Sequence, residues 1–278
     1  MTGRDGPTLL ITSLRNPRIK ALRALQHRKY RQQEGRFLVE GIRLVEEALT
    51  CGAPVETLVH APGLLVSERA RALVAQAAGI DHLAVSDEVF ASLSDREGPQ
   101  GIAAVVRIED RSLEAIPLSG DLLAVVAYGL RDPGNLGSIV RTADAAGASG
   151  VVVVEPSADL YDPQAVRATM GSLFALPVVR MEDGTALATW YTRIRAAGHA
   201  LAVVASSAHG TQVYYELNYC RPLVLLLGSE RHGLPEAVRA QADALVRLPM
   251  AGRATSLNVS AAAAALIYEA VRQRRAAD

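Results

Sequence analysis

The chain has 278 residues, of which half are apolar and about a fifth are charged, and its formal net charge at pH 7 is zero. This composition is typical of a globular protein with a sizeable core, and it excludes disordered, fibrous and uniformly basic chains. The length favours two domains of unequal size.

The charges are unevenly distributed along the chain. Between Arg4 and Arg36 there are nine basic residues against two acidic ones, which gives this arm a charge of +7 and the remaining chain about −7. A separated positive charge of this kind indicates contact with a polyanion such as RNA. A solvated helix face rich in arginine is the alternative.

The N-terminus lacks the basic and then apolar layout of a signal peptide, and no apolar run reaches the length that spans a bilayer. We therefore expect a cytoplasmic protein without a membrane segment. The two cysteines, Cys51 and Cys220, form neither a disulfide framework nor a zinc spacing, and no metal site is predicted.

The first part of the chain alternates between predicted helices and strands. A basic helix over 16–32 starts it, with apolar residues at helical spacing. Further strands are predicted at 37–41, 55–61, 82–86 and 101–109, with helices at 43–52, 67–79 and 87–95. This alternation predicts an α/β unit with a mostly parallel or mixed sheet, which ends at a polar, proline-containing stretch over 109–120.

The strands predicted after this stretch are more strongly apolar, as expected when helices cover both faces of a sheet. They lie at 122–128, 151–155, 199–206, 222–228 and 244–250. Ligands of open α/β sheets bind beyond the carboxyl ends of the strands, so the polar loops after three of these strands are the candidate site.

The first loop follows the strand at 122–128. Its sequence predicts a tight turn and then a helix that starts near Ser138, with Arg131 and Asn135 on the loop and Arg141 on the helix. Strand, glycine loop and helix would also suit a nicotinamide cofactor. However, Gly129, Gly134 and Gly137 do not have the GxGxxG spacing, which disfavours a dehydrogenase.

Two further loops carry polar groups. Gly228 ends a buried strand and Glu230 follows it, where a carboxylate needs a partner or a chemical role; helix capping or a surface arginine would also explain Glu230. In the third loop Gly252 breaks the strand, and Ser256 and Asn258 precede the last helix, which is predicted to begin near Ser256. Ser256 alone could be an N-cap.

Three sequence motifs, taken in order, carry a family resemblance. They are DPGNLGSIVRTADAAGASGVVV, LLLGSERHGL and LPMAGRATSLNVSAAAAALIYEAVRQR. Together they resemble the motifs of the SpoU (TrmH-like) RNA ribose 2'-O-methyltransferases, and VRATMGSLFALPVV between them is also similar to that family. The stretch RFLVEGIRLVEEALTCGAPVETLVHA resembles the small RNA-binding domain that often precedes the catalytic domain.

The resemblance implies a C-terminal knotted (SPOUT-type) α/β methyltransferase domain with a mostly parallel sheet, preceded by a smaller α/β RNA-binding domain, and it implies a homodimer. The expected domains are a basic N-terminal arm over 1–32, an RNA-binding domain over 33–108, a linker over 109–120 and a methyltransferase domain over 121–278.

It also implies S-adenosylmethionine as methyl donor and no metal. The residues expected to hold the donor are Gly228, Ser229, Leu248, Met250, Gly252 and Leu257. The residues expected around the reacting ribose are Asn135, Arg141, Glu230, Ser256 and Asn258. One departure is visible: Arg231 and His232 follow Glu230 where many relatives carry a glycine.

The family assigns the role of base to the arginine that corresponds to Arg141. Because a guanidinium stays protonated at ordinary pH, we hypothesise that Arg141 mainly clamps the neighbouring phosphate; His232 is the alternative base. The expected reaction is 2'-O-methylation of a ribose in RNA, with 23S ribosomal RNA as the expected target. A transfer RNA methyltransferase and a non-catalytic RNA-binding protein remain alternatives, as do a housekeeping and an antibiotic-resistance role.

Overall fold

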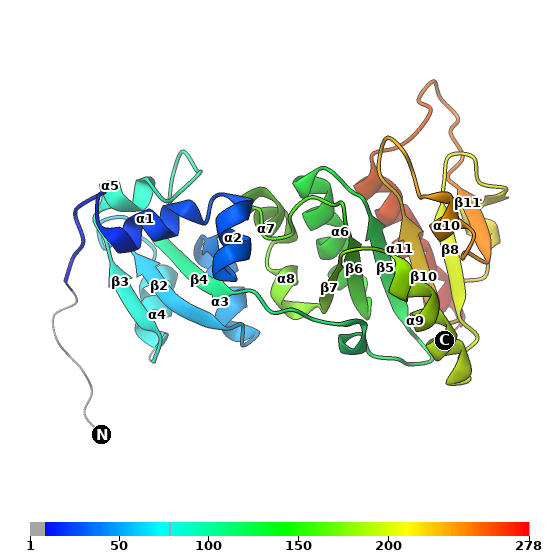
Figure 1. Ribbon diagram of the computed structural model, residues 1–278, viewed down its shortest axis with the longest axis horizontal. Coiled ribbons are helices and arrows are strands. Elements are labelled where there is room, and N and C mark those ends of the chain that lie inside the picture. Colours follow the sequence, from blue (N-terminus) through cyan, green and yellow to red (C-terminus); the bar gives the residue numbers. More distant parts are fainter. Residues whose placement is uncertain (1–8, 78, 278) are drawn as a thin grey trace. The chain divides into compact units, whose positions relative to one another are not determined.

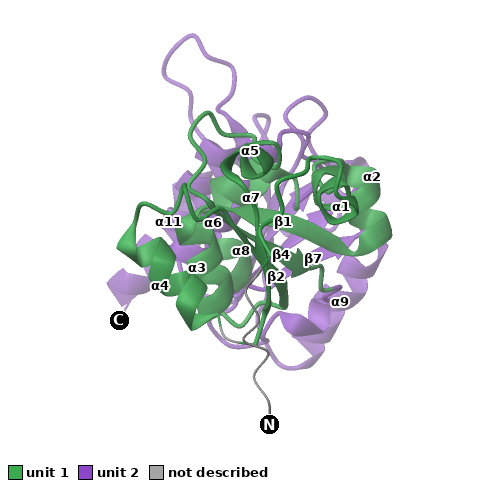
Figure 2. Cartoon of the chain, turned by 90° about the vertical axis from the view of Figure 1, so that its left-hand side faces the viewer, with its two compact units in different colours: residues 1–109, 161–174 green, residues 110–160, 175–278 purple. Residues whose placement is uncertain are grey.

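The computed structural model describes residues 9–77 and 79–277 (Figure 1). By its internal contacts the chain divides into two compact units (Figure 2). The first comprises residues 1–109 and 161–174, and the second comprises residues 110–160 and 175–278. The segment 161–174, which lies inside the predicted methyltransferase domain by sequence, thus belongs to the first unit by contacts.

The first unit contains a mixed four-stranded sheet with the strand order β1-β4-β2-β3. Both β1 and β2 pair with β4 in antiparallel fashion, whereas β2 and β3 are parallel. The strands are β1 (Arg36–Glu40), β2 (Val55–His60), β3 (Asp81–Ala84) and β4 (Ile102–Arg107), and the helices between them are α3 (Ile42–Thr50), α4 (Glu68–Gln76) and α5 (Asp87–Ala91). Each of these elements lies where the sequence predicts it.

The predicted N-terminal helix is two helices, α1 (Pro17–Ala24) and α2 (Arg28–Glu34). Arg31 of α2 bonds to the segment between them: its guanidinium donates to the carbonyl oxygens of Leu25 and Gln26 across 2.9 and 2.8 Å. These carbonyls lie between the two helices and accept side-chain hydrogen bonds from α2. Ile19 and Leu25 are buried in the core of the first unit, so α1 is part of this fold and not a free arm.

The segment 161–174 packs through aromatic contacts and one glycine. The helices α7 (Pro163–Thr169) and α8 (Ser172–Ala175) form most of it. The ring of Phe37 in β1 lies 4.7 Å from that of Tyr161 and 6.4 Å from that of Phe174. A Cβ atom at Gly171 would come within 2.5 Å of Glu47, so only glycine fits there.

The second unit contains a seven-stranded sheet in which all paired neighbours are parallel, with the order β7-β6-β5-β10-β8-β11-β9. The predicted mostly parallel sheet is confirmed. Its strands are β5 (Leu123–Tyr128), β6 (Gly150–Val154), β7 (Val178–Met181), β8 (Ala202–Ser206), β9 (Gln212–Val213), β10 (Leu223–Leu227) and β11 (Ala244–Arg247). Its main helices are α6 (Pro133–Ala145), α9 (Thr185–Ala196), α10 (Glu236–Arg239) and α11 (Val259–Ala277). Among the described helices, none is long and apolar enough to cross a lipid bilayer.

The chain crosses β11 at close range. Ser206 of β8 and Gln212 of β9 both pair with Val246, one from each side of β11. In between, a Cβ atom at Gly210 would come within 2.3 Å of the carbonyl carbon of Val246, so the crossing needs glycine. The knotted path that the resemblance implies stays a prediction.

The C-terminal helix α11 is fixed at its far end by Arg274. Its guanidinium donates to four backbone carbonyls over distances of 2.6 to 3.1 Å; they belong to Asp121, Leu122, Tyr219 and Arg221. Asp121 and Leu122 lie just before β5, and Tyr219 and Arg221 lie just before β10. The helix therefore runs from the carboxyl edge of the sheet, where it starts, to the amino edge, and it packs against α6 on the way.

Candidate active site

Three polar loops meet at one edge of the sheet in the second unit. β5, β10 and β11 belong to one set of parallel strands, so the segments that follow them leave the same, carboxyl edge. The segment after β11, over 248–258, is the orange-red loop that projects at the top right of Figure 1. This is the edge at which open α/β sheets bind their ligands.

The helix after β5 begins earlier than predicted. α6 starts at Pro133 and not near Ser138, because Pro133 suits a first helical position and Asp132 caps the helix. The side-chain oxygen of Asp132 accepts the backbone N–H of Asn135 at 2.7 Å. Asn135 thus lies in the first turn of a capped helix and not on a loop, and the helix fixes the position of its backbone.

The last helix begins later than predicted, at Val259 and not near Ser256. Asn258 is its cap: the side-chain oxygen accepts the backbone N–H groups of Ser260 at 2.8 Å and Ala261 at 3.4 Å. Ser256 is exposed, and no hydrogen bond ties it to another described residue. An asparagine satisfies the same orphan N–H groups as a serine cap would.

Side chains from the segments that follow all three strands are joined by hydrogen bonds. Asn135 donates through Nδ2 to Oε1 of Glu230 at 2.9 Å. Asn258 donates through Nδ2 to Oδ1 of Asn135, also at 2.9 Å. The carboxylate at the end of β10 therefore has an amide partner, and neither a helix cap nor a surface arginine explains Glu230.

The loop after β10 is a tight turn closed on its own backbone. Ser229 and Gly233 exchange two backbone hydrogen bonds of 3.1 and 2.9 Å. A Cβ atom at Gly228 would come within 2.3 Å of the carbonyl carbon of Gly233, so the turn closes only because residue 228 is glycine. Arg231 and His232 lie at the exposed tip of this turn, where their bulk is tolerated.

Arg141 is not joined to this network. It lies six residues after Asn135 on α6, which corresponds to a rotation of about 240° around the helix axis. Its side chain is exposed, and within the described residues nothing forms a hydrogen bond or ion pair with it. The guanidinium is thus available to a ligand.

The apolar residues expected around the methyl donor are unusually open to solvent. Met250 is 36% exposed and Leu257 is 46% exposed, while Leu248 is half-buried. Large apolar side chains that stay exposed beside polar groups are typical of a binding surface. No cluster of metal-ligating side chains occurs within residues 9–77 and 79–277.

Ser260 and Asp132 are members of the site that the sequence interpretation missed. Ser260 donates through Oγ to Oδ1 of Asn258 at 2.6 Å and lies 3.4 Å from Oδ1 of Asn135. An aspartate directly before a proline is a common helix start, so Asp132 could have been found from the sequence. Ser260 gives no such signal.

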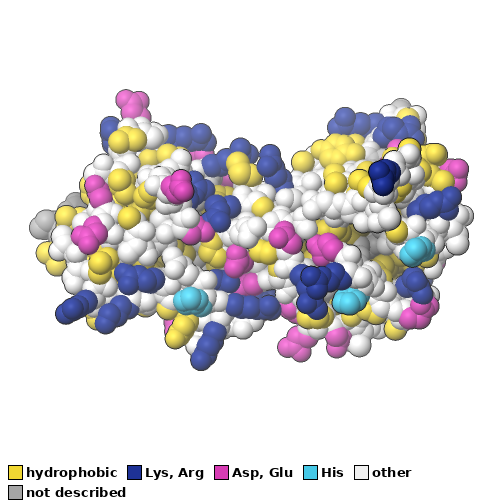
Figure 3. Space-filling model, turned by 90° about the horizontal axis from the view of Figure 1, so that it is seen from above, with side chains coloured by type: hydrophobic (Ala, Val, Ile, Leu, Met, Phe, Trp, Pro, Cys, Tyr) yellow, Lys and Arg dark blue, Asp and Glu magenta, His cyan; other side chains and the backbone are white. Residues whose placement is uncertain are grey.

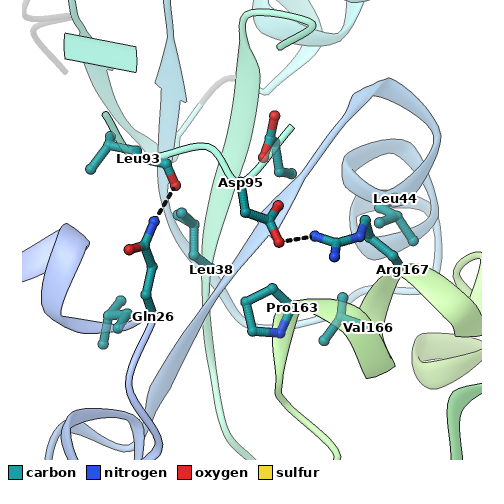
Figure 4. A pocket seen from close by; sticks show the side chains of 10 residues that line it. Gln26, Leu38, Leu44, Leu93, Asp95, Pro163, Val166 and Arg167 are labelled. Atoms are coloured by element: carbon teal, nitrogen blue, oxygen red, sulfur yellow. Dashed lines mark hydrogen bonds and ion pairs between the residues drawn. The ribbon is translucent and has the colours of Figure 1, made fainter. Parts of the chain in front are cut away.

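The first unit has a small cavity of about 30 Å³, which has room for about one or two water molecules. Figure 4 shows its lining, in which the side chain of Gln26 donates to the carbonyl oxygen of Leu93 at 3.1 Å and Arg167 of α7 pairs with Asp95. Glu40 also lines it. Burial raises the pKa of this carboxyl, against the hydrogen bond from Ser94. The cavity is too small for a nucleotide. The carboxyl edge of the second unit, where the three polar segments meet, is the candidate active site.

Comparison with known proteins identifies the family. The SpoU rRNA Methylase family matches residues 122–268, and the MRM3-like substrate binding domain matches residues 16–104. The chain belongs to the SpoU rRNA methylase family. It is 40% identical over 274 residues to the 23S rRNA (uridine(2479)-2'-O)-methyltransferase of Streptomyces viridochromogenes, which covers 98% of this chain and 95% of the relative.

Other relatives of this SpoU family member agree. It is 33% identical over 93% of its length to the 23S rRNA (guanosine(2553)-2'-O)-methyltransferase RlmP of Bacillus subtilis, of which 97% is covered. The crystal structure of the SpoU methyltransferase AviRb from Streptomyces viridochromogenes in complex with AdoMet superimposes with a TM-score of 0.89 at 38% identity, covering 94% of this chain and 99% of AviRb. The predicted family, SPOUT-type fold and enzyme class are confirmed.

Proposed function

We propose that this protein transfers a methyl group from S-adenosylmethionine to a ribose 2'-hydroxyl of 23S ribosomal RNA. The observation that carries the proposal is the hydrogen-bonded set Asn135, Glu230 and Asn258 at the carboxyl edge of a SpoU-type sheet. The names of the relatives supply the RNA class. The chemistry of the site supplies the roles of the residues.

The donor would be held by Gly228, Ser229, Leu248, Met250, Gly252 and Leu257. Two observations fit such a ligand: the exposed apolar side chains of Met250 and Leu257 offer a surface for a flat adenine ring, and the closed turn at Gly228 brings backbone groups to the same edge. S-adenosylmethionine, when bound, supplies a methyl group on a sulfonium and needs no metal. Covering Met250 and Leu257 would also remove apolar surface from water.

The acceptor would be positioned by Arg141 and Glu230. Arg141 has a free, permanently charged guanidinium, which suits a bidentate contact with the phosphate next to the target ribose. One oxygen of Glu230 is taken by Asn135, and the other is left to accept a hydrogen bond from the 2'-hydroxyl. Ser256 would take part as an exposed hydroxyl at the same edge.

The first unit would contribute RNA affinity, but fewer of its basic residues are available than their number indicates. Arg4 lies outside the described residues. Arg18 pairs with Asp81 and Arg36 with Glu56, and Arg31 is buried. Exposed basic side chains that remain for phosphate contacts include Arg15, Lys20 and Lys29.

The second unit also offers basic groups near the candidate active site. Figure 3 looks down on the side from which the loop 248–258 projects in Figure 1, and its right-hand part shows basic side chains beside apolar ones. Exposed arginines of the three loops and α6 are Arg131, Arg141, Arg231 and Arg253. A formally neutral chain would thus present local positive charge to RNA.

The family resemblance further supports a homodimer. The division by sequence into a basic segment over 1–32, an RNA-binding domain over 33–108, a linker over 109–120 and a catalytic domain over 121–278 stays a prediction; by contacts, α1 packs in the first unit, to which 161–174 also belongs. If ribosomal RNA is the substrate, the protein acts in the cytoplasm, where ribosomes are assembled. Sedimentation of the purified full chain would test the dimer, and a mass equal to one chain at micromolar concentration would contradict it.

Transfer of tritium from labelled S-adenosylmethionine tests the reaction. Purified 23S ribosomal RNA, 16S ribosomal RNA and bulk transfer RNA are offered separately, and the product is mapped by its resistance to alkaline cleavage at the methylated ribose. We expect label in 23S ribosomal RNA at one ribose. Label only in transfer RNA would replace the substrate, and binding of RNA without transfer of label would overturn the enzymatic proposal.

A further inference from the structure

We infer that Ser260 is a positioning residue for the proposed methyl transfer, because it sets the direction of a hydrogen-bond chain that ends on Glu230. Ser260 is the second residue of α11, is half-buried, and was not among the residues that the sequence pointed to. The inference rests on the proposed function for its catalytic consequence. The chain of hydrogen bonds itself can be tested without any substrate.

The chain starts where Ser260 holds one end of the Asn258 side chain. Both the hydroxyl and the backbone N–H of Ser260 donate to Oδ1 of Asn258, at 2.6 and 2.8 Å. An amide side chain has one acceptor end and one donor end. Because Ser260 occupies the acceptor end twice, the NH₂ group of Asn258 faces away from α11.

This orientation passes on to Asn135. The NH₂ group of Asn258 donates to Oδ1 of Asn135 at 2.9 Å, and the NH₂ group of Asn135 then donates to Oε1 of Glu230 at 2.9 Å. All donors point the same way along the chain. Reversing the Asn135 amide would put its oxygen against the Glu230 carboxylate and its NH₂ group against that of Asn258, so each link favours the same direction.

Glu230 is the natural end of such a chain, since an ionised carboxylate accepts hydrogen bonds and donates none. Hydrogen bonds in series polarise one another, which strengthens the last one. Asn135 occupies Oε1, so Oε2 remains to accept another hydrogen bond, and we assign it to orienting the ribose hydroxyl. Ser260 thus acts on the reacting group through three other side chains.

Helix capping is the competing explanation for Ser260, and it makes different predictions. A lost cap lowers the melting temperature and affects every function of the second unit alike. Loss of the common direction of the hydrogen bonds between Ser260 and Glu230 leaves the fold and the binding of RNA and S-adenosylmethionine unchanged, and it lowers kcat. The Asn258 amide keeps its bond to the backbone N–H of Ser260, so the expected loss in kcat for Ser260→Ala is moderate, about tenfold.

The test compares Ser260→Ala, Ser260→Thr and the control Thr192→Ala. Thr192 is an exposed helical residue of the same unit whose hydroxyl donates to the carbonyl oxygen of Ala188 at 2.9 Å. We expect kcat to fall about tenfold for Ser260→Ala with the KM for RNA and the Kd for S-adenosylmethionine unchanged, and to recover in Ser260→Thr, which restores the hydroxyl. Thr192→Ala should match the wild type.

A double substitution separates the chain from any independent role of Ser260. In an Asn258→Ala background, replacing Ser260 by alanine should cause much less than a tenfold further loss, because the remaining contact of the hydroxyl, with Oδ1 of Asn135 at 3.4 Å, is long and weak. An additional tenfold loss in that background would overturn the inference, as would wild-type kcat in Ser260→Ala. A parallel fall of kcat and melting temperature that Ser260→Thr fails to restore would also overturn it.

A measurement without substrate keeps the two proposals apart. In the ¹⁵N-labelled full chain, the side-chain NH₂ signals of Asn135 and Asn258 should be shifted and slow to exchange, and Ser260→Ala should move both toward free-amide values while Thr192→Ala moves neither. If the wild type transfers no methyl group but these signals respond as expected, the proposed function is wrong and the series of hydrogen bonds from Ser260 to Glu230 is confirmed. If the signals are unaffected by Ser260→Ala, the proposed series of hydrogen bonds is wrong, whatever the activity.

Discussion

Asn258 donates its side-chain N–H to the side-chain oxygen of Asn135 across 2.9 Å, although 123 residues separate the two along the chain. The bond joins the start of α11 to the start of α6, the two helices that pack on each other in the second unit. Both asparagines are held at helix starts by caps, Asn135 through Asp132 and Asn258 through its own bonds to α11. Their contact is therefore as rigid as the helices that carry them.

Asn135→Asp should make the fold sensitive to pH. The new carboxylate would stand at hydrogen-bond distance from Glu230, and two ionised carboxylates this close repel each other, so the pKa of the pair rises above its value in the unfolded chain. A raised carboxyl pKa contributes stability that is present at low pH and lost as pH rises through the folded pKa. The melting temperature of the variant should thus fall below wild type more at pH 8 than at pH 5. Asn218→Asp, at an exposed turn, is the control, and equal deficits at both pH values would contradict the expectation.

Arg141→Lys should reduce methyl transfer by about a hundredfold or more, since a single ammonium cannot reproduce a bidentate phosphate contact. Binding of S-adenosylmethionine should stay unchanged, because no described residue of the donor loops contacts Arg141. Single-turnover transfer to 23S ribosomal RNA and calorimetry with the donor are the two measurements. Nearly full turnover in Arg141→Lys would refute both the phosphate-clamp and the base assignments.

Arg274→Ala should destabilise the protein by about 2–4 kcal/mol, because it leaves four carbonyl groups without their common donor. Arg275→Ala is the matched control, because Arg275 follows directly in sequence, is exposed, and forms no hydrogen bond or ion pair with another described residue. Urea denaturation of both variants checks the difference. Equal midpoints would show that the end of α11 does not hold the amino edge of the sheet.

Removal of the whole basic arm is a poor test of RNA binding, because Ile19 and Leu25 belong to the core of the first unit. Charge reversal of exposed residues is cleaner. Lys20→Glu combined with Lys29→Glu should weaken RNA binding and reduce the slope of log K against log salt by about one to two, while the melting temperature stays constant. Glu34→Lys, a change of opposite sign on α2, is the control. An unaltered slope in the double variant would place the RNA elsewhere.

Glu40→Gln should stabilise the first unit at neutral and alkaline pH. Burial raises the pKa of Glu40, while the hydrogen bond from Ser94 and the charges of Arg96 and Arg167 oppose the rise and the charge of Asp95 adds to it. The wild type therefore loses stability as pH rises through this folded pKa, and a neutral amide does not. The gain in melting temperature should be larger at pH 8 than at pH 5. Glu97→Gln, exposed in a neighbouring loop, should show no such trend.

The sequence predicted the strands well and the site only in part. Strands such as β5 and β10 were predictable because uninterrupted apolar runs are typical of buried parallel strands. The break between α1 and α2 was not predicted, because helical spacing continues through it; its carbonyl groups are bonded by the Arg31 side chain. Helix starts were shifted where a different residue, Asp132 or Asn258, serves as cap.

The polar residues of the site were named from a resemblance, but their connection could not be. That Asn135 bridges Glu230 and Asn258 follows from the strand order, which brings the ends of β5, β10 and β11 to one edge. Local sequence carries no such information. Ser260 was missed for the same reason, because a serine early in a helix has many ordinary uses and its meaning here depends on a residue far away in sequence.

The segment 161–174 has a consequence for how such proteins can be rebuilt. The chain passes between its two units three times, so neither unit is an uninterrupted stretch of sequence. A chimera that exchanges only the first 109 residues for those of a relative would leave Tyr161, Phe174 and Gly171 facing foreign partners in place of Phe37 and Glu47. A chimera with a new substrate preference must therefore exchange residues 1–109 and 161–174 together.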